Sequence, residues 1–105
     1  MSPPDGTVDL LVIGDCNPDV LVLGVNAIDI EHGAYVHHEG EASINRLLAQ
    51  QAQRVVVAAD SSKIGKRAFA RVCDLSQVDF LVTDTGITRD AKARFTEAGV
   101  TVIAV

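Results

Sequence analysis

The chain has 105 residues, which is enough for one domain. Apolar residues make up 48% of it and aromatic residues only 4%, so the core of this globular sequence must be aliphatic. The formal net charge is −5, whereas DNA-binding surfaces need Lys and Arg to replace the counterions of the phosphates. The chain as a whole is therefore not expected to bind nucleic acid, although one local positive group could still hold a small phosphorylated ligand.

The sequence contains no segment that resembles a signal peptide. Its apolar runs are also far shorter than the ~20 residues that a membrane helix needs. Cys16 and Cys73 show no Cys-x-x-Cys spacing, which favours two buried free thiols in a reducing compartment. These features predict a cytoplasmic protein with no membrane partner.

The first half of the chain predicts two short strands, a loop and a helix. Residues 1–7 hold prolines and a glycine and are expected to form a loose tail. Apolar runs at residues 8–13 and 20–23 each end at a glycine and indicate buried strands. Residues 24–40 show weak periodicity and are predicted to be a loop, followed by a helix over residues 41–52. The apolar residues on one face of this helix are Ile44, Leu47, Leu48 and Ala52.

The middle of the chain predicts a central strand followed by a polar loop. Residues 54–59 are β-branched and apolar on both faces, as in an interior parallel strand covered by helices. The polar loop spans residues 60–65. Residues 68–73 fit either a helix or a strand, and we favour a strand. Residues 75–78 predict one short turn.

The last third predicts a strand, a helix and a final strand. The strand at residues 80–83 ends at Asp84. Thr88 is a suitable N-cap for a helix over residues 89–98, and Gly99 stands where a glycine commonly ends a helix. Residues 100–105 predict the last strand. The alternation of strands and helices at short spacing predicts an α/β fold, with a mostly parallel sheet and flanking helices.

A series of landmarks in residues 21–105 resembles a known family. The landmarks are Leu23-Gly24, Ala27-Ile28-Asp29, Gly33, Glu39-Gly-Glu-Ala42, Val55-Val-Val-Ala-Ala-Asp-Ser-Ser-Lys63, Ile64-Gly-Lys-Arg-Ala68 and Phe80-Leu-Val-Thr-Asp84. Their order is similar to the carboxyl-terminal sensor domain of DeoR-family transcriptional regulators. The resemblance implies a fold like that of ribose-5-phosphate isomerases and CoA transferases. It also implies a phosphorylated-sugar effector that releases the repressor from DNA.

The resemblance also indicates what this chain lacks. The family has an amino-terminal winged helix-turn-helix that binds operator DNA, and its sensor domain has an early glycine-rich phosphate loop. Neither is present in this sequence, and Tyr35-Val-His-His38 stands where the family often has Thr-Thr-Pro-Asp. We therefore expect residues 21–105 to be a partial sensor domain. It would contact DNA only through a missing domain, and alone it would bind its effector weakly or not at all.

The first 20 residues differ from this pattern. Residues 8–19 are similar to the opening of ribokinase-like sugar kinases, which would imply that Asn17 and Asp19 contact a sugar. No Gly-x-Gly-Asp motif follows, and a strand with a turn is the simpler interpretation. We treat residues 1–20 as a tail and first strand of uncertain origin, separate from residues 21–105.

The candidate ligand-binding residues follow predicted strands or precede the first predicted helix. Lys63 is the main candidate, because ligands of open α/β sheets bind at the carboxyl ends of the strands and an ammonium can hold a phosphate. The other candidates are Asp60, Ser61, Ser62, Glu39, Glu41 and Asp84. The alternative is purely structural: capping at Asp60 and the helix start, an Asx turn at Asp84, and a solvated Lys63.

Three histidines close together in the sequence raise the alternative of a metal site. The residues are His32, His37 and His38, with Glu31 and Glu39 nearby in the sequence. Adjacent histidines point apart on regular structure, so a solvated loop is the preferred interpretation. The sequence also contains no Gly-x-Gly-x-x-Gly fingerprint and no evident catalytic triad. We therefore predict no metal, no cofactor and no catalytic residue.

Three functions stay open at this point. The preferred one is a fragment of a regulator's sensor domain. The alternatives are a small sugar-phosphate-binding enzyme remnant, of the isomerase or ribokinase-like type, and a piece used only for dimerisation. Because an incomplete domain exposes a sheet edge or an apolar face, we also expect homo-oligomers.

Overall fold

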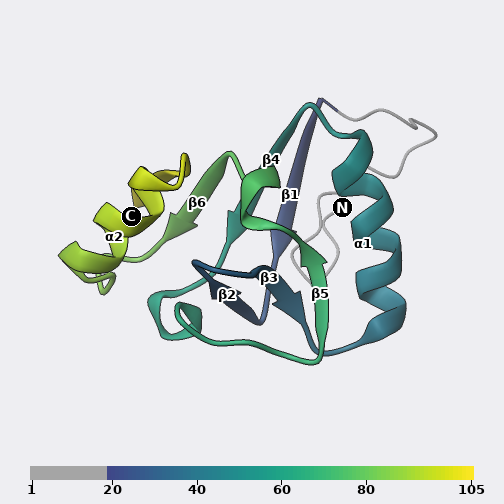
Figure 1. The fold of residues 1–105 in the computed structure, drawn as a ribbon, viewed down its shortest axis with the longest axis horizontal. Helices are drawn as coiled ribbons and strands as arrows, with labels where there is room; N and C mark the ends of the chain where they lie inside the picture. Colours follow the sequence, from purple (N-terminus) through teal and green to yellow (C-terminus); the bar gives the residue numbers. More distant parts are fainter. Residues whose placement is uncertain (1–18) are drawn as a thin grey trace.

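The computed structural model describes residues 19–105, which form two sheets, two α-helices and two short 3-10 helices. The predicted strand at residues 8–13, Cys16 and Asn17 lie outside the described residues, and so does most of the segment at residues 1–20. Figure 1 shows the α-helix α1 at one end of the molecule and α2 at the other, with the strands between them.

The larger sheet is parallel and confirms the predicted α/β class. Its strands are β1 (Val20–Gly24), β4 (Arg54–Ala58), β6 (Phe80–Thr83) and β7 (Thr101–Ala104), in the order β1-β4-β6-β7. All three pairings are parallel. β4 lies between two neighbours, as its β-branched sequence predicted, and the predicted strands in these four places match the structure within two residues at either end.

The second sheet corrects the prediction of a loop over residues 24–40. β2 (Ala27–Asp29) and β3 (Gly33–Val36) form an antiparallel pair, and β3 pairs antiparallel with β5 (Ala70–Cys73). The strand favoured at residues 68–73 is thus confirmed, but it belongs to this three-stranded sheet. β2 and β3 are buried along their whole length. Their sequences therefore show no polar–apolar alternation, and they are too short for a clear apolar run.

Gly33 permits the tight connection between β2 and β3. Its φ of 107° lies in a region that residues with a side chain rarely adopt. A Cβ atom built on Gly33 would lie 2.0 Å from the backbone oxygen of Cys73, at the end of β5. A glycine is therefore needed both for the turn and for the approach of β5.

The helices have nearly the predicted bounds. α1 spans Glu39–Gln51 and α2 spans Arg89–Glu97. Thr88 caps α2 as predicted, since its Oγ1 accepts a hydrogen bond from the backbone N–H of Ala91 at 3.1 Å. Gly99 follows α2 with a φ of 94°. The polar loop after β4 contains the 3-10 helix η2 (Ser61–Lys63), and the predicted turn after β5 is η3 (Leu75–Gln77).

The predicted apolar face of α1 is packed only in part, because Leu48 and Ala52 lie against the core while its other two residues are exposed. Ile44 and Leu47 are 62% and 57% exposed, although an apolar helical face is normally packed against the core. The residues buried on α1 are Ala42, Asn45 and Ala49. These small side chains let the helix approach β3 and β5, which is the physical reason for the different orientation.

The core lies on one side of the larger sheet. Leu21, Val57 and Leu81 point to this side, where they join buried residues of the second sheet, α1 and α2. The strand register puts a second set of side chains on the opposite side, which we call the outer face. The apolar residues of the outer face are Val20, Val22, Val56, Phe80, Val82 and Ile103, and the polar Arg54 and Thr101 lie in the same register. All of these are half-exposed or exposed.

Candidate functional site

A cavity of about 450 Å³ opens at the carboxyl ends of β1 and β4. Three segments line it: the end of β1 with the residues that follow, the end of β4 with η2, and the junction between β3 and α1. The lining residues are Gly24, Val25, Asn26, His37, His38, Glu41, Ala58, Ala59, Asp60 and Lys63. The small side chains at the ends of the two strands leave the space, which falls in the usual size range of ligand pockets.

Lys63 is held in this cavity by the local structure of η2. The carboxylate of Asp60 caps η2 by accepting the backbone N–H of Ser62 at 3.0 Å, and it also pairs with the Ser62 hydroxyl. The Asp60 carbonyl accepts the backbone N–H of Lys63 at 3.0 Å. Lys63 is half-buried and lines the cavity together with Asp60 and Glu41. Three of the predicted site residues are thus brought together.

Asp84 fastens η2 to the end of β6. Its Oδ2 accepts the backbone N–H of Ser61 at 2.9 Å, and its Oδ1 accepts the backbone N–H of Gly86 at 2.7 Å. The bonds from Ser61, followed by the bond from Gly86, hold the pKa of Asp84 below its ordinary value. Neither Asp84 nor Ser61 lines the cavity. Their contact instead fixes η2, which carries the lining residue Lys63.

Glu39 lies at the start of α1 but outside the cavity lining. Its carboxylate pairs with Arg46, which lies two turns further along the same side of the helix. Arg46 also donates to the backbone carbonyl of Arg71 at 2.6 Å, which ties α1 to β5. The structure thus separates Glu39 from Glu41, which does line the cavity.

Three polar lining residues were not among the predicted site residues: Asn26, His37 and His38. The Asn26 side chain accepts the backbone N–H of His37 at 3.0 Å, and the Asn26 N–H donates to the Tyr35 carbonyl at 2.9 Å. These bonds fix the segment that leads from β3 into α1. A sequence signal for the β2–β3 pair would have indicated that the residues after β1 lie close to the residues after β3.

The amino end of α1 forms one wall of the cavity. His38 is the N-cap of α1, but its side chain makes no capping hydrogen bond. The amino end of a helix carries a partial positive charge and unpaired backbone N–H groups. This wall therefore favours an anionic group in the cavity.

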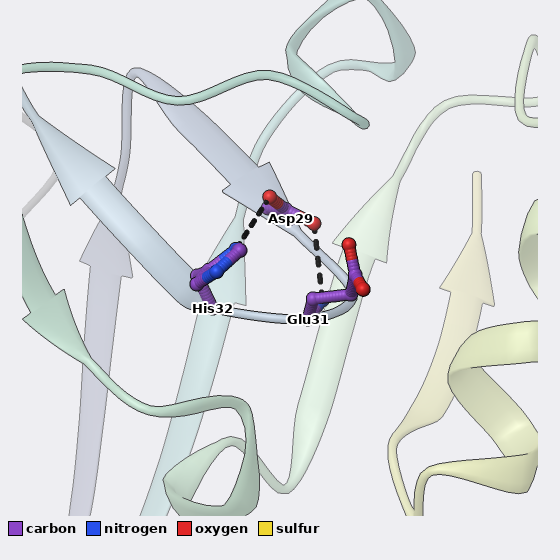
Figure 2. A group of neighbouring side chains, drawn as sticks. All are labelled: Asp29, Glu31 and His32. Atoms are coloured by element: carbon purple, nitrogen blue, oxygen red, sulfur yellow. Dashed lines mark hydrogen bonds and ion pairs between the residues drawn. The ribbon is translucent and has the colours of Figure 1, made fainter.

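Asp29, Glu31 and His32 form a separate cluster at the turn between β2 and β3 (Figure 2). Asp29 Oδ1 accepts the backbone N–H of Glu31 at 3.0 Å, and its Oδ2 lies 3.0 Å from His32 Nδ1. The bond from Glu31, followed by the bond from His32, lowers the pKa of Asp29. Asp29 is therefore held as a carboxylate by its neighbours.

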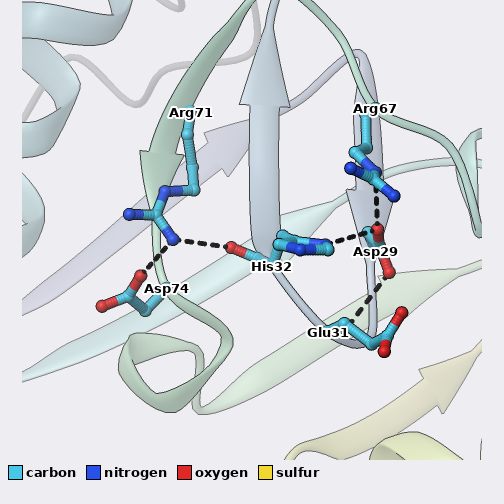
Figure 3. Close-up of polar contacts among 6 residues, drawn as sticks. All are labelled: Asp29, Glu31, His32, Arg67, Arg71 and Asp74. Atoms are coloured by element: carbon cyan, nitrogen blue, oxygen red, sulfur yellow. Dashed lines mark hydrogen bonds and ion pairs between the residues drawn. The ribbon is translucent and has the colours of Figure 1, made fainter.

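The surroundings of Asp29 are those of an ion-pair network rather than a metal centre. Arg67 Nε lies 3.1 Å from the same carboxylate oxygen that contacts His32. On the next strand, Arg71 pairs with Asp74 at 2.6 Å and donates to the His32 carbonyl at 3.3 Å (Figure 3). The positive charge of Arg67 lies on the carboxylate oxygen that also contacts His32, and it repels a divalent cation at that point.

Cys73 is a buried free thiol, as predicted for it. Burial raises its pKa to about 11, which keeps it in the unreactive thiol form at neutral pH. Within the described residues, no helix combines the length and the apolar character that a membrane crossing requires.

Comparison with known proteins identifies the family. The sequence model of the DeoR C-terminal sensor domain matches residues 6–85. A protein of Escherichia coli O157:H7 named "Putative aga operon transcriptional repressor" is 40% identical over 87 residues, which are 83% of this chain and 32% of that protein. The HTH-type transcriptional regulator GlpR of Haloferax volcanii is 39% identical over 87 residues, 83% of this chain and 34% of that protein.

A third relative is the HTH-type transcriptional repressor GlcR of Bacillus subtilis. It is 38% identical over 66 residues, which are 63% of this chain and 25% of that protein. The chain thus spans about a third of the length of the first two relatives and a quarter of the third. These matches confirm the resemblance seen in the sequence: the chain belongs to the DeoR C-terminal sensor domain family.

Proposed function

We propose that this chain is the effector-sensing part of a DeoR-type transcriptional regulator, and that its cavity binds a phosphorylated sugar or a related phosphorylated metabolite, only weakly when the chain is alone. The observation that carries the proposal is the half-buried Lys63 in a cavity of about 450 Å³ at the carboxyl rim of a parallel sheet. An ammonium group at this point holds a phosphate as a point charge. The amino end of α1 adds partial positive charge to the same space.

The predicted site residues take different parts in this proposal. Asp60 and Glu41 line the cavity, so their carboxylates are available to accept hydrogen bonds from sugar hydroxyls. Ser61 and Ser62 form the 3-10 turn that carries Lys63. Asp84 fixes that turn, and Glu39 pairs with Arg46 beside the helix start, so both act on the position of the site.

We place DNA binding elsewhere in a longer regulator. A net charge of −5 does not suit a DNA-binding surface, and two of the relatives carry HTH in their names. The effector would shift the intact protein between a DNA-binding and a released state by binding one of them more tightly. Because the relatives are transcriptional regulators, the enzyme alternative is not favoured. We therefore also propose that the protein works in the cytoplasm.

The test is ligand binding followed by thermal unfolding and calorimetric titration. Glycerol 3-phosphate and hexose 6-phosphates serve as probes, and the unphosphorylated compounds serve as controls. A ligand at a hundred times its Kd stabilises the fold by about 2.7 kcal/mol. We expect Lys63→Ala to remove most of this gain. The matched control is Lys66→Ala, since Lys66 is exposed and does not line the cavity.

Two results would contradict the proposed function. If no phosphorylated probe binds at millimolar concentration, the chain does not sense such an effector by itself. If a probe binds and Lys63→Ala leaves its affinity intact, the ligand lies outside the proposed cavity.

We also propose that the chain forms homo-oligomers, with a second copy seated on the outer face. Both faces of a parallel sheet are normally covered, whereas the outer face keeps Val22, Val56 and Phe80 half-exposed. A two-fold contact would cover the outer faces of both copies at once.

A further inference from the structure

His37 and His38 line the cavity that contains Lys63, but the ligand-binding proposal above gives them no part. Both side chains are exposed, and the backbone of this segment is fixed by the bond from the His37 N–H to the Asn26 side chain. Histidine is the side chain whose charge ordinarily changes between pH 5 and 8. The lining of the cavity thus includes two side chains of this type.

The other charges around the cavity do not favour an anion when both imidazoles are neutral. Lys63 supplies one positive charge, while Glu41 and Asp60 supply one negative charge each. The wall formed by Gly24, Val25 and Asn26 has no charge. Glu39, next to His38, is paired with Arg46. The lining charges therefore sum to −1 with neutral imidazoles, and two protonated imidazoles reverse the sign to +1.

We propose that His37 and His38 determine the specificity of this cavity for anionic ligands by binding the anion in their protonated form. The inference rests on the proposed function, because it concerns the ligand of the same cavity. It predicts that affinity for a ligand of constant charge rises as the pH falls from 8 to 6. By the reciprocity of linked equilibria, a bound anion must in turn favour protonation of both histidines.

The first experiment is an NMR titration of the imidazole protons with inorganic sulfate, whose charge stays constant in this pH range. The reference is sodium chloride at equal ionic strength. We expect sulfate to raise the protonation constants of His37 and His38 by about threefold each, as for a dianion roughly 12 Å away in water. His32, the chain's third histidine, is an internal control, because it contacts Asp29 at the β2–β3 turn instead of lining the cavity.

The second experiment measures sulfate affinity between pH 6 and pH 8 in variants. Two threefold effects predict a rise of several-fold, and at most about ninefold, on going to pH 6 in the unchanged protein. The double variant His37→Gln, His38→Gln should lose this pH dependence, and His32→Gln should keep it. Because His37 and His38 are exposed, these variants are expected to fold, which far-UV circular dichroism checks.

The outcomes separate this inference from the proposed function. If sulfate binding requires Lys63 but keeps its pH dependence in the double variant, the inference is overturned and the proposed function stands. If the double variant loses the pH dependence while Lys63→Ala leaves the sulfate affinity unchanged, the inference stands. The role of Lys63 in the proposed function is then wrong. If sulfate shifts the titration of His32 as much as that of the other two histidines, the effect is general ion binding and the inference is wrong.

Discussion

Gly33 is the residue whose replacement should disturb the fold most directly. Any side chain there meets two obstacles: a φ of 107° and the Cys73 carbonyl oxygen, 2.0 Å from the position of a Cβ atom. We expect Gly33→Ala to lower the free energy of unfolding by about 2–3 kcal/mol, because β5 must move away from β3. Urea denaturation measures the change, and Gly40→Ala is the control, since a Cβ on Gly40 meets nothing within 4 Å. Equal stability of both variants would contradict this account of the turn.

Asp29 should make the stability depend on pH below about pH 4. Its pKa is lowered in the folded state, first by the Glu31 N–H and then by His32. A carboxylate with a lowered pKa stabilises the fold above the pKa of the unfolded chain, and this contribution is lost as the pH falls through the folded-state value. Asp29→Asn should therefore destabilise the protein at pH 7, by about 1 kcal/mol, and progressively less as the pH approaches 2.

Denaturation curves of both proteins from pH 2 to pH 7 measure this difference. Glu31→Gln is a suitable control, because Asp29 is bonded to the backbone of Glu31 and not to its carboxylate. A difference between Asp29→Asn and the unchanged protein that stays constant across the range would show that the charge of Asp29 does not contribute.

At the scale of single residues, the sequence allowed prediction of some cavity residues and not of others. Lys63 and Asp60 directly follow a β-branched strand, a position that is typical of ligand sites in parallel sheets. His37 and His38 reach the same cavity because the end of β3 is bonded to Asn26, which follows β1. That arrangement depends on long-range pairing, which no local pattern in residues 24–40 indicates.

The orientation of α1 gives a prediction at the scale of the element. Ile44 and Leu47 project into solvent at 62% and 57% exposure, whereas Ala49 is 5% exposed against the core. Ile44→Lys and Leu47→Lys should change the free energy of unfolding by less than about 0.5 kcal/mol. Ala49→Lys should destabilise strongly, because it puts a larger charged side chain into the core. The same denaturation assay compares all three variants.

The reverse order of stabilities would show that α1 packs through its larger apolar residues. The periodicity in the sequence predicted the helix and its bounds within two residues, but it placed the packed side correctly only at Leu48 and Ala52. Close packing against β3 and β5 selects small residues, and that preference appears only when the neighbouring strands are known.

At the scale of the whole molecule, alternation of strands and helices predicted the parallel sheet, and the structure has it. The same rule did not predict a second, antiparallel sheet, because β2, β3 and β5 are short and buried. The three strands pack on the side of the larger sheet that also receives α1 and α2. Among residues 19–105, the side of the larger sheet opposite these elements keeps apolar side chains half-exposed or exposed, and a charge or hydropathy profile cannot locate such a face.

The outer face predicts self-association, which light scattering after size exclusion can measure. The expected mass is twice the 11.1 kDa of the chain, because apolar side chains from neighbouring strands gain by leaving water together. Ile103→Lys puts a charge on the outer face at a side chain that is already 42% exposed, so it should weaken the dimer without unfolding the chain. Ile44→Lys is the matched control, since Ile44 lies on α1 and away from that sheet.

A monomeric unchanged protein at high micromolar concentration would contradict self-association. A dimer weakened by Ile44→Lys but not by Ile103→Lys would move the contact to α1.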